Sequence, residues 1–91
     1  HQVMGSLSAL IEGAQLADRH LEVLEHSQRL LELDPCRQEA ALAAMQALIA
    51  LGRPEEAVRR YEACNKALKR ELDMEAGIPL LEAFHRAKLS L

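Results

Sequence analysis

The stretch LGRPEEAVRRY, residues 51–61, gives the clearest structural signal in the sequence. A glycine such as Gly52 readily adopts the left-handed backbone that ends a helix, and a proline such as Pro54 is tolerated in the first turn of the next helix. Two glutamates follow the proline, where negative charge suits the positive end of a helix dipole. The stretch therefore predicts a tight turn between two helices, one over about residues 37–51 and one over about residues 54–72.

The predicted helix over residues 37–51 is apolar over a wide arc. Its apolar side chains are Ala41, Ala44, Met45 and Leu48, with Leu42 and Ile49 flanking them. An arc wider than a single stripe indicates contact with two neighbouring helices. The helix over residues 54–72 has one apolar face, formed by Ala57, Tyr61, Cys64, Leu68 and Leu72 with Val58 further round. Each helix of this pair therefore has a face to bury.

The same periodicity predicts two helices before this pair and one after it. A first helix over about residues 4–16 carries Val3, Leu7, Leu10, Ile11 and Ala14. After Asp18, a second helix runs to about Leu33, with a stripe of Val23, Leu24, Leu30 and Leu31. Asp34-Pro35 ends it, because a proline disfavours helical geometry in the preceding residue. Residues 73–79 form a connector, and a last helix carries Leu80, Leu81, Phe84, Ala87 and Leu91. Five helices and no strand candidate predict an all-α fold.

A 34-residue internal period relates the two helix pairs. In this register Ala57 matches Val23, Cys64 matches Leu30, Leu48 matches Ala14 and Ala44 matches Leu10. Helix-turn-helix units of this length are typical of tetratricopeptide repeats. The period predicts a tetratricopeptide-like, right-handed array of antiparallel helix pairs with a C-terminal capping helix.

Composition argues against several classes of function. Of the 91 residues, 49% are hydrophobic and 2% aromatic, and 14 acidic residues against 11 basic ones give a net charge of -3. Direct nucleic-acid binding is therefore the weakest binding model, since such binders neutralise phosphates and stack bases. Without a long apolar run or a leader, we expect a cytoplasmic domain with no membrane partner. Because the chain begins with His1, we expect residues 1–91 to be a single domain taken from a longer protein.

Reactive side chains form no recognised catalytic or metal-binding motif. The four histidines, His1, His20, His26 and His85, lack HxxxH or HExxH spacing. Cys36 and Cys64 lack the CxxC spacing of metal or redox sites. The serines have no nucleophile-elbow context, and the glycines are scattered. We expect no enzyme activity, no metal and no cofactor, with both cysteines present as structural thiols.

Four stretches resemble the bacterial transcriptional activator domain. They are LLELDPCRQEA at residues 30–40, ALGR at 50–53, EAVRRYE at 56–62 and LKREL at 68–72. The resemblance covers about residues 17–91, and it departs at Ala76-Gly77, where that family more often has a proline. It implies a tetratricopeptide-like domain beside a winged-helix DNA-binding domain in a bacterial transcriptional regulator.

The resemblance also implies a role in protein interaction. The expected partners are the flanking DNA-binding domain, a second copy in a homodimer, or the transcription machinery. The alternative is a general tetratricopeptide scaffold that binds a peptide or a partner helix.

Two surfaces are candidates for partner binding. The groove positions of tetratricopeptide units, matched residue by residue, correspond to Glu39, Leu42, Gln46 and Ile49. Two roles stay open for Leu42 and Ile49, either packing beneath a neighbouring helix or lining an apolar groove for a partner. The second surface is a basic stripe of Arg59, Lys66 and Arg70. It is either a solvated face or a contact for an acidic partner.

Overall fold

The computed structural model describes residues 9–11, 13, 15 and 19–91, and every regular element within these residues is an α-helix. Four complete helices are α2 (His20–Leu33), α3 (Gln38–Ala50), α4 (Pro54–Leu72) and α5 (Ile78–Leu89). Residues 9–11, 13 and 15 are also helical, as predicted for the first helix. The rest of that prediction, with Val3, Leu7, Ala14 and Asp18, lies outside the described residues. The all-α fold is confirmed.

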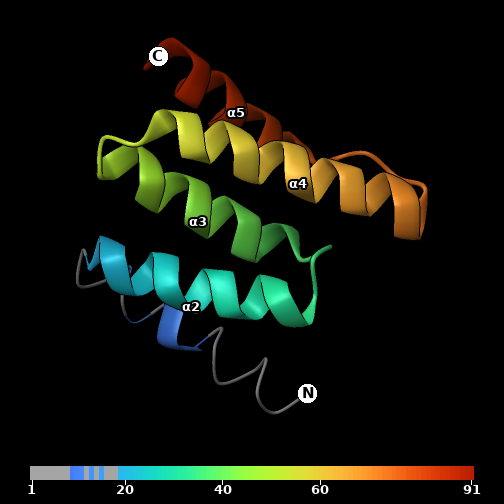
Figure 1. The fold of residues 1–91 in the computed structure, drawn as a ribbon, viewed down its shortest axis with the longest axis horizontal. Helices are drawn as coiled ribbons and strands as arrows, with labels where there is room; N and C mark the ends of the chain where they lie inside the picture. Colours follow the sequence, from blue (N-terminus) through green and yellow to red (C-terminus); the bar gives the residue numbers. More distant parts are fainter. Residues whose placement is uncertain (1–8, 12, 14, 16–18) are drawn as a thin grey trace.

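The helices form a layered stack in which sequential helices run antiparallel. Figure 1 shows α2, α3 and α4 side by side with alternating direction. The last helix, α5, packs against both α3 and α4. Because α4 reverses the chain between them, α3 and α5 run in the same direction. This arrangement is compatible with a tetratricopeptide-like array of helix pairs.

The turns between the helices follow the predicted chemistry. Asp34 follows the last residue of α2, and its carboxylate accepts a hydrogen bond of 3.2 Å from the backbone N–H of Cys36. Gly52 has a φ of 75°, so the left-handed stop after α3 is present. Pro54 is the first residue of α4, where its missing N–H costs nothing. Both turns are set by residues within a few positions of the bend.

Alanines make up most of the buried residues of α3. The buried residues of this helix are Ala40, Ala41, Ala43, Ala44, Met45, Ala47 and Leu48. The wide apolar arc is therefore confirmed, but α3 contacts three described helices, α2, α4 and α5, where the sequence predicted two neighbours. Small side chains allow this, because helix axes approach more closely where the contact residues are small.

The 34-residue period holds for both matches in the second helix of each pair and fails for the one match in the first helices that lies within the described residues. Val23, Leu30, Ala57 and Cys64 are all buried, so those two matches are confirmed. The match between Leu10 and Ala44 is wrong, because Leu10 is 50% exposed while Ala44 is fully buried. The match of Leu48 with Ala14 lies partly outside the described residues. Next to Leu10 the buried residue is Ile11, which the sequence also placed on the apolar face of the first helix.

The connector after α4 is fixed by a long-range hydrogen bond. The backbone N–H of Gly77 donates to the Oε1 atom of Gln38 at 2.7 Å. A Cβ at residue 77 would lie 3.1 Å from that oxygen, so glycine suits this close approach. A proline here would lack the donor. The bond places the start of α5 beside the start of α3, and α5 begins at Ile78, two residues before the predicted start at Leu80.

Some residues predicted to face the core are exposed. Leu72, Leu81 and Leu91 are 56%, 40% and 63% exposed. Leu72 lies in the last turn of α4, which extends beyond the neighbouring end of α3 in Figure 1. Leu81 lies away from the buried face of α5, and Leu91 lies beyond the end of that helix at Leu89. The buried residues of α5 are Leu80, Ala83 and Ala87, so the inward face is shifted toward Ala83, which the sequence prediction omitted.

Enlarging a buried alanine of α3 should destabilise the fold. Ala44 is fully buried, so Ala44→Leu must push neighbouring helices apart and should lower the free energy of unfolding by about 1 to 3 kcal/mol. Ala50→Leu is the matched control, because Ala50 belongs to the same helix and is exposed. Urea denaturation followed by circular dichroism measures both. Equal stability of the two variants would contradict close packing at α3.

Within the described residues, two left-handed positions should respond oppositely to substitution. Gly52→Ala places a Cβ in a left-handed conformation and should destabilise the chain by about 1 to 2 kcal/mol, although nothing lies within 4 Å of that Cβ. Asp73, with a φ of 50°, is the non-glycine counterpart after α4. Asp73→Gly should leave stability unchanged or raise it by up to about 1 kcal/mol. Thermal and urea denaturation check both signs; stabilisation by Gly52→Ala would refute the assigned turn.

Candidate protein-interaction surfaces

The four predicted groove residues lie together on the outward face of α3, which we define as Glu39, Leu42, Gln46 and Ile49. Their spacing of three, four and three residues places them on one side of the helix. Glu39 and Gln46 are exposed, whereas Leu42 and Ile49 are half-buried and pack against the core. The packing of Leu42 and Ile49 against the core supports the first of the two roles that the sequence left open, and the partner-binding role stays a prediction. Each contributes to the core and still presents part of its side chain to solvent.

Gln46 also lines a hollow between α3 and the start of α2. The hollow has a volume of about 390 Å³, and its lining residues are Gln15, His20, Val23, Ala43, Gln46 and Ala47. Three of these side chains carry amide or imidazole groups, and the other three are apolar. A partner side chain with one polar group could therefore find both kinds of contact here. The periodicity of α3 alone did not predict this hollow, because it depends on where α2 begins.

The predicted basic stripe is exposed along α4, as expected, but it lies among acidic groups. Arg59, Lys66 and Arg70 are all exposed, and the Arg70 guanidinium lies 3.2 Å from the Glu71 carboxylate. The residues that share a shallow hollow with Lys66 are Glu62, Asn65, Lys69 and Glu75. The stripe lies opposite the buried face of α4, so it does not join the outward face of α3. Its mixed charge is that of an ordinary solvated helix surface.

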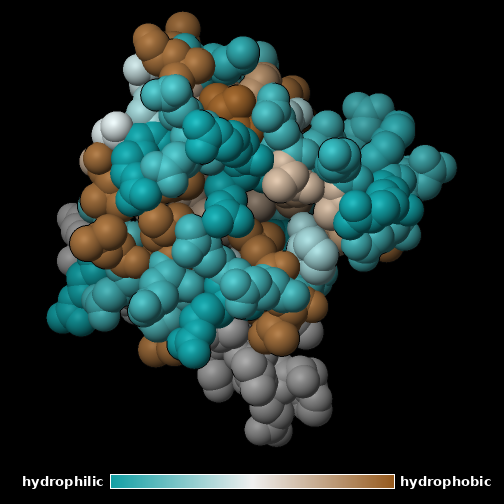
Figure 2. All heavy atoms as spheres, in the orientation of Figure 1, coloured by the Kyte–Doolittle hydropathy of each residue, from teal (hydrophilic) through white to brown (hydrophobic). Residues whose placement is uncertain are grey.

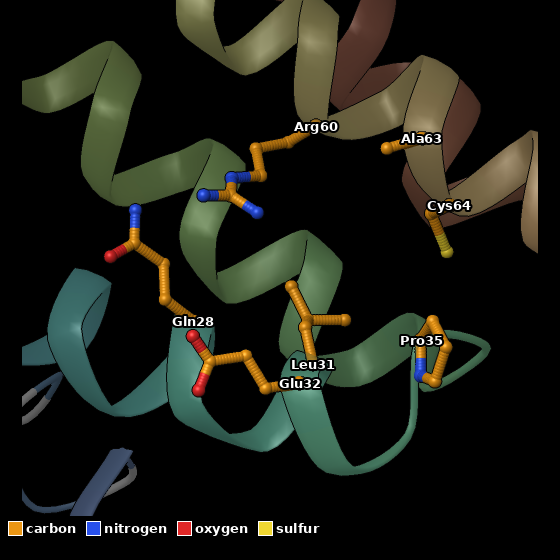
Figure 3. A pocket seen from close by; sticks show the side chains of 7 residues that line it. All are labelled: Gln28, Leu31, Glu32, Pro35, Arg60, Ala63 and Cys64. Carbon is orange, nitrogen blue, oxygen red and sulfur yellow. The ribbon is translucent and has the colours of Figure 1, made fainter.

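A groove between α2 and α4 was missed by the sequence analysis. Figure 3 shows its walls, and its volume is about 220 Å³. Its apolar lining residues are Leu31, Pro35, Ala63 and Cys64, and its polar ones are Gln28, Glu32 and Arg60. Arg60 extends from α4 toward α2 in Figure 3, yet no ion pair among the described residues joins it to Glu32. The two walls are far apart in the sequence, so only the packing of α2 and α4 on α3 creates the groove.

The two cysteines are free thiols, as predicted. Burial raises the pKa of the Cys64 thiol, and the nearby Cys36 and Asp34 raise it further. Burial also raises the pKa of the Cys36 thiol, with Glu71 and Asp34 adding to the shift and Arg70 opposing it. A raised pKa keeps a thiol protonated and therefore a poor nucleophile at neutral pH. The geometry favours packing roles for both residues.

Hydrophilic side chains cover most of the face that Figure 2 presents, and hydrophobic groups form small separate patches among them.

Among the described residues, no group of three His, Cys, Asp or Glu side chains is placed to hold a metal ion. None of the described helices is long and apolar enough to cross a membrane. Of the histidines within this part of the chain, His20 and His26 are partly buried and His85 is exposed.

The stability contributed by Cys64 should depend on pH. Because burial raises its pKa in the folded chain, the unfolded chain loses this proton first as pH rises. The unfolded state then binds fewer protons, so the free energy of unfolding falls above about pH 8.5. Cys64→Ala removes this pH-dependent contribution of the thiol to the free energy of unfolding. Urea denaturation under reducing conditions, at neutral and at alkaline pH, measures the free energy of unfolding of both chains. The difference between the native sequence and the variant should shrink as pH rises, and a constant or growing difference would contradict this prediction.

Comparison with known proteins assigns the chain to a family. The family model described as the bacterial transcriptional activator domain matches residues 1–88, so the likeness extends further toward the N-terminus than the residues 17–91 predicted from the motifs. No curated protein and no solved structure matches the chain significantly. Domains of this family are parts of bacterial transcriptional regulators. With nearly its whole length matched, the chain belongs to the bacterial transcriptional activator domain family.

Proposed function

We propose that this domain is a protein-interaction module of a bacterial transcriptional regulator, and that the outward face of α3 is its contact surface. Family membership supports the setting in transcription regulation. The observation that carries the surface is the half-burial of Leu42 and Ile49 beside the exposed side chains of Glu39 and Gln46. The role is one of binding in the cytoplasm, without catalysis and without a cofactor.

The composition of this face supports protein contact. Protein interfaces combine an apolar centre with a polar rim that remains near solvent. Leu42 and Ile49 supply apolar area already held by the core, so little side-chain entropy is lost when a partner covers them. Glu39 and Gln46 supply hydrogen-bonding groups, and the hollow beside Gln46 offers a pocket for a partner side chain. Such a face suits a helix of the flanking DNA-binding domain or of the transcription machinery.

The charges on the surface favour protein over nucleic acid as the partner. A phosphate-binding face needs an excess of Lys and Arg. Here Lys66 and Lys69 share their hollow with two glutamates, and Arg70 pairs with Glu71. The basic stripe therefore fits a solvated helix face. DNA contact is left to another domain of the regulator.

Adding positive charge to the outward face of α3 should impair transcription activation. The double variant Glu39→Arg/Gln46→Arg changes two exposed residues, so the fold should survive. In the full-length regulator, reporter transcription should fall about tenfold, the change expected when about 1.4 kcal/mol of contact energy is lost. Thermal stability should fall only slightly, because Glu39 lies in the first turn of α3, where a positive charge is mildly unfavourable. The amount of regulator in cells should be unchanged. Glu25→Arg, the same kind of change on an exposed position of α2, should retain activation.

Crosslinking from the outward face of α3 can identify the partner. A photo-crosslinking amino acid at residue 46 should form an adduct with the flanking domain or with a subunit of the transcription machinery, and the same group at residue 25 should not. Full activation by the α3 double variant, with no adduct specific to residue 46, would refute this contact surface.

A further inference from the structure

The last helix has a second, unpartnered stripe opposite the face that it buries. Leu80, Ala83 and Ala87 face the core. On the other side, at spacings of four, three and four residues, lie Ile78, Glu82, His85 and Leu89, and all four are exposed. We call these four residues the α5 stripe. The capping helix of a repeat array is expected to be polar outside, yet Ile78 is 72% exposed and Leu89 is 90% exposed.

We propose that the α5 stripe pairs with the same stripe of a second copy of this chain, with the two helices antiparallel about a twofold axis. The stripe is symmetric about its own midpoint. Ile78 lies as far before that midpoint as Leu89 lies after it, and Glu82 and His85 are placed in the same way. An antiparallel pair therefore sets Ile78 against the partner's Leu89 at both ends. It also sets Glu82 against the partner's His85 twice near the centre.

Charge complementarity selects a second copy over another apolar partner. Arg86 lies one residue beyond His85 and is exposed, so each Glu82 meets the partner's His85 with the partner's Arg86 beside it. No ion pair within the described residues uses Glu82, His85 or Arg86, so these groups are available. A parallel pair would instead place Glu82 against Glu82 and Arg86 against Arg86. Like charges in contact disfavour that arrangement.

The size of the stripe sets the strength of the dimer. α5 has 12 residues, which makes it about 18 Å long at roughly 1.5 Å per residue. Two such helices bury less than the roughly 1,200 to 2,000 Å² of a stable protein interface. The dimer is therefore weak and dependent on concentration.

The inference rests on the proposed function in that it names a second copy as one partner of the interaction module, but it uses α5 and not the outward face of α3.

A charge-exchange experiment tests the pairing directly. Sedimentation velocity of the 91-residue chain, from about 10 μM to about 1 mM, spans the range of a weak dimer. The chain should self-associate as concentration rises. Glu82→Arg alone brings a new positive charge against the partner's Arg86, and Arg86→Glu alone brings a new negative charge against the partner's Glu82. Each variant should therefore associate about tenfold more weakly. An equimolar mixture of the two variants restores opposite charges and should recover association.

Two controls separate this contact from general effects of charge and hydrophobicity. Glu25→Arg makes the same charge change on α2 and should associate like the native chain. Leu89→Asp should abolish association, whereas Leu21→Asp, at an exposed leucine of α2, should not. Circular dichroism confirms that each variant is folded.

Three results would overturn the proposal: a monomer at every concentration, association unaffected by Glu82→Arg and Leu89→Asp, or a mixture no stronger than its components. None of these results tests the proposed contact role of the outward face of α3. That role is tested by reporter transcription and by crosslinks at residue 46. The two proposals can therefore fail separately.

Discussion

The close approach of three helices to α3 determines both the core and the surface that the domain presents. Five of the seven buried residues of α3 are alanines, so α2, α4 and α5 reach its backbone from three directions. Burial on so wide an arc leaves α3 with one free side, and that side holds Glu39, Leu42, Gln46 and Ile49. The candidate contact surface is thus the side that packing leaves open. Its backbone is held rigidly because every other side of the helix is occupied, and a rigid surface loses little entropy when it binds.

The parts of the fold that could be predicted from sequence are those set by neighbours in the chain. Gly52 and Pro54 specify a turn through their own backbone preferences, and Asp34-Pro35 ends α2 in the same way. The buried faces of α3 and α4 follow from residue spacing. In the first helix the prediction chose both Leu10 and Ile11 for the buried face although only Ile11 is buried, because two adjacent apolar residues satisfy the same period. Only contact with the rest of the fold decides between them.

Features that depend on distant segments were outside the reach of the sequence. The Gly77 to Gln38 hydrogen bond joins residues 39 positions apart, and no local pattern marks either one as a partner. The groove between Leu31 and Cys64 arises from two helices that are both packed on α3. The candidate residues on α3 were placed on one face by spacing alone. Their degree of exposure could not be predicted, because it depends on how close α5 and α2 come to the same helix.

The bond between Gln38 and Gly77 also links the two proposed contact surfaces. It fixes the start of α5 beside the start of α3, and the helices run in the same direction from there. The α5 stripe therefore keeps a constant orientation to the outward face of α3. A twofold pairing through α5 would then hold two α3 faces at a defined separation and angle, since a symmetric contact repeats the same geometry in both copies. A regulator with two such domains would present its partner surfaces as a fixed pair, and residues 38 and 77, which belong to neither surface, would set their spacing.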